Sequence, residues 1–318
     1  MAKSFVPSIL RPDYTWPCRP PFIVSPITPP VPRVSWKPIR VAWGLVHRAL
    51  RYFSQWYCHW FGIHFDYNII PLPFGLLIKW TDRSSVEEAI ATQMARAAGM
   101  PVPKVLNYGE QLYPDCNRKV SILMTRLPGI DLNNWEDKEY DPESEEPWLQ
   151  ELKACVQTMR LWKPPSSRQN WVSSAIGTCL RSQRVPHHIM GPFTDQTQLH
   201  DFLLSTASNH TFKSQAEFEK VLTTAKKLDQ RKYRMVFSQG DLKAHNILVG
   251  DDGHLTGFLD WESAGWYPEY WEFTTAMRFG RNSWWFRAVS WIGGSEYLEE
   301  LDYDRAVNSL TVDSYAFF

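Results

Sequence analysis

The chain has 318 residues, and its 34 Lys and Arg residues balance 34 Asp and Glu residues. This length fits about two domains or one bilobal unit, which can bury a core without disulfide or metal support. The hydrophobic content of 44% excludes a wholly disordered chain. The zero net charge argues against nucleic-acid binding through bulk electrostatics.

The cysteines are scattered, and neighbouring ones lie at least 24 residues apart. This spacing excludes the paired cysteines of a structural zinc site. An odd, scattered set without a secretory signal favours a reducing compartment, and we expect a cytoplasmic protein. The five are Cys18, Cys58, Cys116, Cys155 and Cys179.

Residues 1–38 hold ten of the 23 prolines. Because proline donates no backbone hydrogen bond, we predict a mostly disordered, extended leader. A ligand for an SH3 or WW domain is the sharper alternative.

Residues 39–61 are predicted to form a basic amphipathic helix. Apolar residues recur at spacings of three and four, at Val41, Leu45, Ala49, Tyr52 and Trp56. The polar side carries Arg40, His47, Arg48 and Arg51, and no Asp or Glu occurs from Tyr14 to Phe65. A helix docked on the following domain is the favoured interpretation. Peripheral contact with an anionic membrane and a transit peptide are the alternatives.

Residues 62–130 are predicted to form a small antiparallel sheet that carries one helix. The segments HFDYNIIPL and PFGLLIKW indicate a hairpin, and VPKVLNYG and KVSILMTRL indicate two further strands. Between them, SSVEEAIATQMARAAGM predicts a helix with Ser84 or Ser85 as its N-cap.

Residues 131–318 are predicted to be mainly helical, with one cluster of strands at 234–260. The acidic stretch 131–151 is expected to contain a solvated linker, and a patch that attracts a cationic substrate is the alternative. Helices are predicted in WLQELKACVQTMRLW, TDQTQLHDFLLSTAS and QAEFEKVLTTAKKLD. The predicted fold class is therefore α+β.

One constellation of residues indicates phosphoryl transfer. The segment FSQGDLKAHNILV places Asn246 five residues after Asp241, and a following apolar strand in LTGFLDWE ends at Asp260. Mg²⁺ prefers a few oxygen ligands, such as the side chains of Asn246 and Asp260. A further carboxylate must orient the attacking hydroxyl, and positive charge such as that of Lys243 must face the transferred group.

These residues carry a resemblance. GDLKAHNILV followed by FLDWE resembles the catalytic and metal loops of the aminoglycoside phosphotransferase and choline kinase-like family, in particular its fungal-type members. PFGLLIKW, the VEEA helix, PVPKV and ILMTRLPG resemble the small lobe and hinge of that family, so the likeness covers roughly residues 62–280. It implies a bilobal protein-kinase-like fold, with an N-lobe at 62–130 and a C-lobe at 131–318. ATP is expected between the lobes, at the hinge 125–129.

The resemblance also implies roles for individual residues. Asp241 matches the catalytic Asp, and Asn246 and Asp260 match the two magnesium ligands. The matching loop favours a phosphate contact for Lys243, and an ordinary surface lysine is the alternative. The nucleotide residues matched are Lys79 for the α and β phosphates, Glu88 as its ion-pair partner, and Met124, Thr125 and Leu127 around the adenine. Backbone groups of Thr125 and Leu127 would bond the adenine edge.

Glu88 competes with Glu87 as the partner of Lys79. We expect Ser84 and Glu87 to form a capping box, which leaves Glu88 for the lysine. Two departures from the family pattern stand beside these matches. Gln239 replaces the usual His before Gly-Asp, and the turn PLPFG contains only Gly75. Since Gln has both a donor and an acceptor, it can still brace the loop.

Several other side chains near these motifs are expected to have structural roles, or their roles are undecided. His245 is expected to face solvent. Acidic residues after Asp260 either bind the acceptor or brace helices: Glu262, Glu269 and Glu272. The aromatic residues Trp266, Tyr267, Tyr270 and Trp271 favour a core over a stacking cage.

The functional hypothesis is an ATP- and Mg²⁺-dependent kinase that phosphorylates a hydroxyl of a small molecule. No GxSxG, GxGxxG or Walker motif offers another chemistry. The alternative is a catalytically silent binding or scaffold protein on the same fold, which Gln239 and the single-glycine turn motivate. The acceptor and the oligomeric state are not specified by the sequence.

Overall fold

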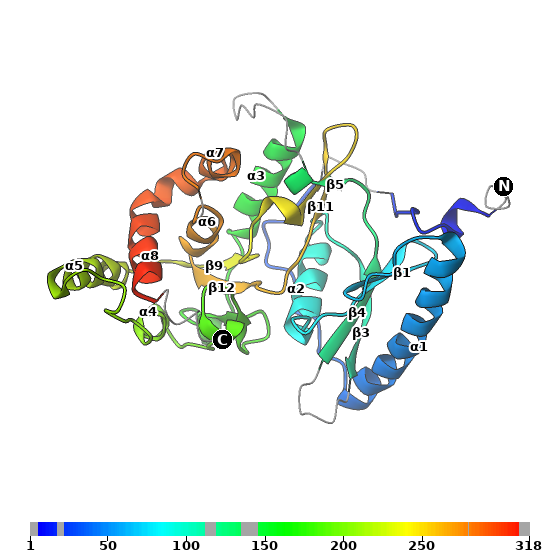
Figure 1. Ribbon diagram of the computed structural model, residues 1–318, viewed down its shortest axis with the longest axis horizontal. Coiled ribbons are helices and arrows are strands. Elements are labelled where there is room, and N and C mark those ends of the chain that lie inside the picture. Colours follow the sequence, from blue (N-terminus) through cyan, green and yellow to red (C-terminus); the bar gives the residue numbers. More distant parts are fainter. Residues whose placement is uncertain (1–5, 18–21, 112–118, 135–145, 279, 312–318) are drawn as a thin grey trace. The chain divides into compact units, whose positions relative to one another are not determined.

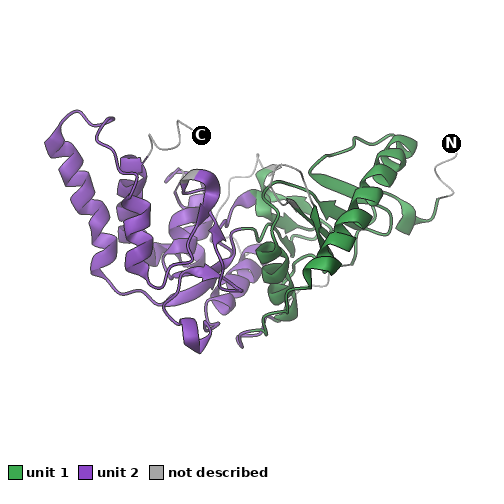
Figure 2. Ribbon diagram, turned by 90° about the horizontal axis from the view of Figure 1, so that it is seen from below, with its two compact units in different colours: residues 1–23, 29–135, 245–262 green, residues 24–28, 136–244, 263–318 purple. Residues whose placement is uncertain are grey.

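The computed structural model describes residues 6–17, 22–111, 119–134, 146–278 and 280–311. They form two compact units, shown in different colours in Figure 2. Unit 1 combines residues 1–23, 29–135 and 245–262, and unit 2 combines residues 24–28, 136–244 and 263–318. The chain therefore leaves unit 1 and later returns to it with residues 245–262.

Unit 1 is built on a four-stranded antiparallel sheet with the strand order β1-β2-β4-β3. Its strands are β1 (Ile69–Leu72), β2 (Leu76–Lys79), β3 (Val105–Gln111) and β4 (Lys119–Thr125). The predicted hairpin and the two further strands are all present. Lys79 pairs with Ile69 on one side and with Ile122 on the other, so it lies on an inner strand.

The helices α1 (Lys37–Phe61) and α2 (Val86–Ala97) pack on this sheet (Figure 1). Side chains alternate between the two faces of a strand. Ile78 of β2 belongs to a buried cluster against which Leu50 of α1 packs. Its neighbour Lys79 instead contacts Glu88 of α2. The strand β2 thus presents an apolar residue to α1 and a charged residue to α2.

The predicted helix at 39–61 is docked on the sheet, but the prediction of its apolar packing face was wrong. Leu45, Tyr52 and Trp56 are exposed. The side of the helix that was predicted to be polar packs on the sheet instead, and the buried residues of α1 are Gly44, His47, Ser54, Tyr57 and Cys58.

A close backbone approach explains this choice of face. A Cβ atom at Gly44 would lie 2.1 Å from the carbonyl oxygen of Glu110 in β3, so only glycine fits at the crossing. The polar residues on this face find partners. The two ring nitrogens of His47 lie 2.7 Å from Ser121 Oγ and 2.6 Å from Asn107 Oδ1. Burial lowers the pKa of His47, which keeps the ring neutral.

The leader is not the free tail that its proline content predicted. Phe74 N–H donates to the carbonyl of Ile9 at 2.7 Å, and Trp16 Nε1 donates to the carbonyl of Phe74 at 3.0 Å. Trp16 N–H donates to the carbonyl of Arg126 at 3.1 Å. Proline removes donors but leaves carbonyl acceptors and the intervening N–H groups, and these hold the leader on the β1–β2 turn.

A second, three-stranded sheet of unit 1 has the order β11-β10-β5. Its strands are β5 (Ile130–Asp131), β10 (Ile247–Val249) and β11 (Leu255–Phe258). Leu248 pairs with Asp131, and Ile247 pairs with Phe258. This sheet joins residues 245–262 to the end of the segment that follows β4.

Unit 2 contains a three-stranded sheet in the order β6-β12-β9 and a hairpin of β7 and β8. Its strands are β6 (Ser173–Ser174), β7 (Leu180–Arg181), β8 (Ile189–Met190), β9 (Met235–Ser238) and β12 (Gly265–Pro268). Its helices are α3 (Pro147–Met159), α4 (Gln196–Leu204), α5 (Gln215–Ala225), α6 (Trp271–Ala276), α7 (Trp284–Ile292) and α8 (Leu298–Thr311). The predicted helices and the strand cluster are present, so the α+β class is confirmed. Residues 135–145 of the acidic stretch lie outside the described residues.

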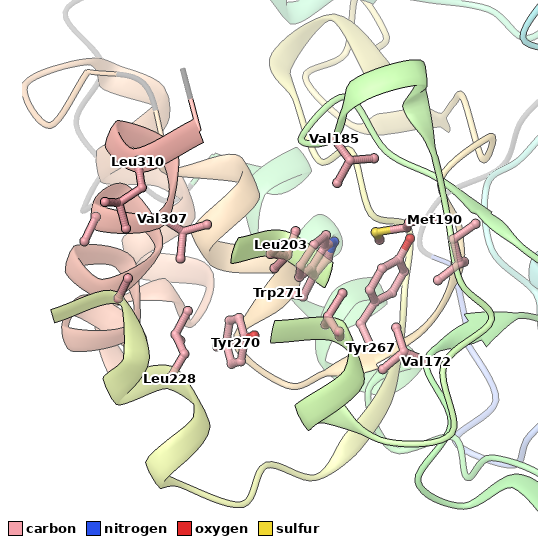
Figure 3. Close-up of a cluster of buried hydrophobic side chains, with 14 of the residues drawn as sticks. Val172, Val185, Met190, Leu203, Leu228, Tyr267, Tyr270, Trp271, Val307 and Leu310 are labelled. Atoms are coloured by element: carbon pink, nitrogen blue, oxygen red, sulfur yellow. The ribbon is translucent and has the colours of Figure 1, made fainter. Parts of the chain in front are cut away.

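The core of unit 2 forms around aromatic residues (Figure 3). Tyr267, Tyr270 and Trp271 are fully buried among Leu203, Val307 and other apolar side chains. The rings of Tyr267 and Trp271 stack with centroids 5.0 Å apart. The preference for core over a stacking cage is therefore confirmed for these residues.

Candidate active site

The ammonium group of Lys79 is the centre of a charged cluster in unit 1. It donates to Glu88 Oε1 at 2.8 Å and to Asp260 Oδ1 at 2.7 Å. Glu262 Oε2 lies 3.7 Å away. The structure thus brings together three residues that the sequence analysis singled out and adds Glu262 to them.

Glu88 reaches Lys79 because of where α2 begins. Ser85 is the N-cap of α2, and its hydroxyl accepts a hydrogen bond from Glu88 N–H at 3.1 Å. The predicted capping box of Ser84 and Glu87 is therefore wrong, since the helix starts one residue later. Glu88 stands at the third helical position, and its carboxylate turns to the lysine.

The cluster holds an excess of acidic groups. Oxygen atoms of Glu88, Asp260 and Glu262 lie within 4.8 Å of one another. Burial raises the pKa of Glu88 to about 7; the charge of Lys79 opposes this shift, and those of Asp260 and Glu262 add to it. Burial alone would lower the pKa of Lys79, but attraction to Glu88 and Asp260 raises it, so the lysine stays protonated. Carboxylates crowded in this way attract a further cation.

Asp260 is placed by the turn that follows β11. Its φ of 54° lies in the left-handed region, which Asp tolerates better than most residues. Leu259 N–H donates to the carbonyl of Asn246 at 2.7 Å, so the two expected metal ligands belong to segments that are bonded to each other. Asn246 itself is buried just before β10.

A cavity of about 480 Å³ lies within unit 1. It is large enough for a cofactor-sized ligand. All seven residues predicted for the nucleotide and the metal line it: Lys79, Glu88, Met124, Thr125, Leu127, Asn246 and Asp260. The lining of the cavity is partly apolar and partly charged: Leu77 and Leu248 contribute apolar surface, and Lys79 and Asp260 contribute charge.

The segment after β4 has backbone groups available at this cavity. Thr125 is fixed by Lys104, whose N–H donates to Thr125 Oγ1 at 2.9 Å and whose carbonyl accepts from Thr125 N–H at 3.1 Å. Arg126 N–H donates to the carbonyl of Gly75 at 2.7 Å. Among the hydrogen bonds of the described residues, none has the Leu127 N–H as its donor. A ligand acceptor can take that position.

The loop that carries Asp241 belongs to unit 2 and is held by a buried carboxylate. Glu272 Oε2 accepts from Gln239 N–H at 2.7 Å, and Glu272 Oε1 accepts from Gly240 N–H at 3.2 Å. The side-chain oxygen of Gln239 then accepts from Asp241 N–H at 2.8 Å. Gln239 therefore braces the loop, as expected for a residue in the position of the usual His.

Lys243 lies beside the Asp241 carboxylate. Its Nζ is 2.8 Å from Asp241 Oδ1 and donates to Gln183 Oε1 at 2.7 Å. In this structure Lys243 thus contacts the predicted catalytic Asp, and its predicted phosphate contact stays a prediction. His245 is exposed, as expected.

Residues 77–306, well over half of the chain, match the model of the phosphotransferase enzyme family. The chain belongs to this family. No curated protein matches its sequence.

Two solved structures are similar to this family member. A thermostable variant of the aminoglycoside phosphotransferase APH(4)-Ia, crystallised with ADP and hygromycin B, is similar at 14% identity, with a TM-score of 0.50 over 76% of this chain and 80% of that one. A choline/ethanolamine kinase family protein from Mesorhizobium loti is also similar, at 13% identity, with a TM-score of 0.45 over 78% of this chain and 74% of that one. The first likeness confirms the protein-kinase-like fold.

Some residues of the family member's site were not assigned from sequence. From sequence, Glu262 and Glu272 could either bind the acceptor or brace a helix. In the structure Glu262 lies beside Lys79, whereas Glu272 accepts hydrogen bonds from the Asp241 loop. Gln183 was missed, because no local pattern marks a side chain 60 residues before Lys243 as its partner. Glu269 contacts Arg234, with Oε2 3.6 Å from Arg234 Nε, and so braces unit 2.

Proposed function

We propose that this phosphotransferase moves the γ-phosphoryl group of ATP to a hydroxyl of a small molecule and needs Mg²⁺. The observation that carries the proposal is the cavity of unit 1, which all seven residues expected for nucleotide and metal line. These residues were selected from sequence alone, so their gathering around one cavity is an independent result. It supports the assignment without specifying the acceptor.

The walls of the cavity fit a nucleotide. A purine ring needs apolar surface above and below it, which Leu77, Met124 and Leu248 supply. A polyphosphate needs positive charge, which Lys79 supplies in a position fixed by Glu88. The Leu127 N–H is the donor we assign to the adenine edge.

The oxygen ligands fit a hard divalent cation. Mg²⁺ takes one or two carboxylates and leaves its other positions to phosphate and water. Asp260 and Asn246 are the ligands we assign, and Glu262 adds a buried carboxylate within the same cluster. A bound ion would supply positive charge that offsets the charge of the transferred phosphoryl group.

Asp241 is assigned to the acceptor. Its carboxylate orients the acceptor hydroxyl and takes its proton while the hydroxyl oxygen bonds to the γ-phosphorus and the bond to the β–γ bridging oxygen breaks. ADP and a phosphate ester are the products. The bonds from Glu272 through Gln239 hold the loop that presents this carboxylate. Lys243, next to Asp241, is assigned to the transferred phosphoryl group.

The first experiment is the thermal shift of the full chain with ATP, with and without Mg²⁺. We expect stabilisation that depends on Mg²⁺, because a ligand that binds the folded state raises the melting temperature. Asp260→Ala should abolish the Mg²⁺-dependent part. Asp251→Asn, an exposed acidic residue in the turn between β10 and β11, is the matched control and should behave like wild type. An unchanged Mg²⁺-dependent shift in Asp260→Ala contradicts the metal assignment.

The second experiment is ATP consumption with a panel of hydroxyl compounds that includes aminoglycosides, choline-like amines and sugars. Asp241→Asn should lose turnover and keep the nucleotide-induced shift. Wild-type turnover in Asp241→Asn would refute the catalytic role. The silent scaffold is the alternative function, and it predicts no shift at millimolar ATP. Deleting residues 1–61 cannot separate the two functions, because α1 is packed into unit 1.

A further inference from the structure

The solvent-facing side of α1 is apolar and aromatic. We call the outer face of α1 the set Leu45, Tyr52, Phe53, Trp56 and Trp60, whose members are between 41 and 67% exposed. They recur at helical spacings, so they lie on one side of the helix. The rings of Trp56 and Trp60 stack with centroids 6.1 Å apart. The exposed side chains of Ile39 and Val46 extend this surface.

This distribution is the reverse of that in an ordinary docked helix. A surface helix normally buries its large apolar residues and exposes its polar ones. In α1 the buried positions include Gly44, His47 and Ser54, and these pack on the sheet through small size or hydrogen bonds. Packing within unit 1 therefore does not account for the large apolar residues on the outer face. A contiguous exposed apolar patch of this kind marks an interaction surface.

The border of the outer face is basic. Lys37, Arg48 and His59 follow one another at intervals of eleven residues, which is three helical turns, so they form one row. All three are exposed. The helix contains no Asp or Glu, and Arg48 donates to the uncharged Gln111. Lys37 and Arg48 therefore keep their positive charge.

The composition of this surface fits lipid better than a second copy of the chain. Tryptophan and tyrosine gather where an apolar interior meets water, as in the headgroup region of a bilayer. In a symmetric dimer formed through the outer face, the basic rows would meet a helix without acidic residues. Among the described residues, no helix is long and apolar enough to cross a membrane.

We propose that the outer face of α1 docks on an anionic membrane surface. The side chains of Tyr52, Trp56 and Trp60 enter the headgroup region, and the row of Lys37 and Arg48 lies against anionic headgroups. Burial of apolar side chains supplies affinity, and the basic row supplies preference for negative lipid. The sheet-facing side of α1 keeps the helix fixed to unit 1, so the whole unit moves to the membrane with it.

Flotation of the full chain with lipid vesicles tests the proposal. The probes are phosphatidylcholine vesicles and phosphatidylcholine vesicles with about 30% phosphatidylserine. We expect the protein to float with the anionic vesicles and to be released by raised salt. Trp56→Ser with Trp60→Ser should weaken the binding by at least about tenfold, the loss expected when a large apolar side chain no longer enters the lipid. Lys37→Gln with Arg48→Gln should remove the preference for anionic vesicles.

Matched controls separate docking from a general effect of exposed apolar residues. Leu161→Ser and Leu298→Ser remove exposed apolar side chains of unit 2 and should float like wild type. All variants should keep the wild-type melting temperature, since the altered side chains are exposed. Absence of flotation, or equal flotation of Trp56→Ser with Trp60→Ser, overturns the proposal. Light scattering gives a further test. If wild type is a dimer and Trp56→Ser with Trp60→Ser is a monomer, a second copy of the chain covers the outer face, and the proposal is overturned.

Discussion

Glu272 gives a prediction in which stability, pH and the Asp241 loop are linked. Its carboxylate is fully buried in unit 2 and accepts the N–H groups of Gln239 and Gly240. Burial raises its pKa from an ordinary 4.5 to about 7; the two backbone hydrogen bonds oppose this shift, and the charge of Asp241 adds to it. We expect Glu272→Gln to reveal this shift in the free energy of unfolding.

The sign follows from proton uptake. Between pH 4.5 and pH 7 the folded protein keeps the proton of Glu272 while the unfolded chain has released it. The contribution of protonated Glu272 to the free energy of unfolding is therefore fully present below about pH 4.5 and is lost as the pH rises through about 7. A shift of this size corresponds to about 3 kcal/mol in total, and to roughly 2–3 kcal/mol between pH 5 and pH 8.

Glutamine imitates the protonated acid and cannot ionise. One oxygen of Glu272, Oε2, accepts from both Gln239 N–H at 2.7 Å and Gly240 N–H at 3.3 Å. A glutamine oxygen in that place retains both bonds. Glu272→Ala instead leaves two buried donors unpaired, which costs about 3–5 kcal/mol with the added cavity.

Urea unfolding at pH 5 and pH 8, followed by circular dichroism, is the assay. Wild type should lose roughly 2–3 kcal/mol of unfolding free energy relative to Glu272→Gln over this range. Glu272→Ala should be the least stable of the three at pH 5. Parallel pH profiles for wild type and Glu272→Gln would refute the reasoning, because they would mean that Glu272 titrates alike in both states.

Three further predictions rest on single positions. Gly44→Ala should lower the stability by about 2–4 kcal/mol despite the better helix propensity of Ala, because the new Cβ would lie 2.1 Å from the Glu110 carbonyl; a raised melting temperature would contradict this. Gly240→Ala should cost about 2–3 kcal/mol in urea unfolding, since its φ is 83° and its Cβ would lie 2.4 Å from the Ser263 carbonyl; wild-type stability would mean that the loop is not held there. Burial lowers the pKa of His47, so the unfolded chain takes up that proton first and the folded state loses stability as the pH falls below about 6.5. His47→Gln should show a smaller decline between pH 7 and pH 5 than wild type, and an equal decline would contradict a buried neutral ring.

The sheet of unit 1 and the nucleotide residues were predictable because their signals are local. Short apolar runs around turn residues indicate the strands, and a strand followed by a capped helix places Lys79 near an acidic residue of that helix. The choice of Glu88 agrees with the observed contact, although the cap is Ser85 rather than Ser84. Local patterns locate an element to within a residue or two and leave its exact start to the cap geometry.

Other features depend on partners far along the chain. The periodicity of residues 39–61 predicts a helix, but the packed face is set by the approach of Gly44 to β3, which no pattern within the helix contains. The bracing of Gly240 by Glu272 joins residues 32 positions apart. The leader has the composition of a free tail and is nevertheless held through Trp16 by hydrogen bonds to unit 1.

The return of residues 245–262 to unit 1 has a consequence for biosynthesis. The cavity is lined by residues from Ile69 to Asp131 and again by Asn246 to Trp261, so its wall is complete only after the long intervening segment of unit 2 has been translated. At about 5–20 residues per second, a ribosome spends several seconds on that segment. A nascent or prematurely terminated chain that ends within residues 136–244 carries Lys79 but lacks Asn246 and Asp260. Translation products that end in this segment therefore cannot assemble this cavity or compete for the ligand of the finished protein.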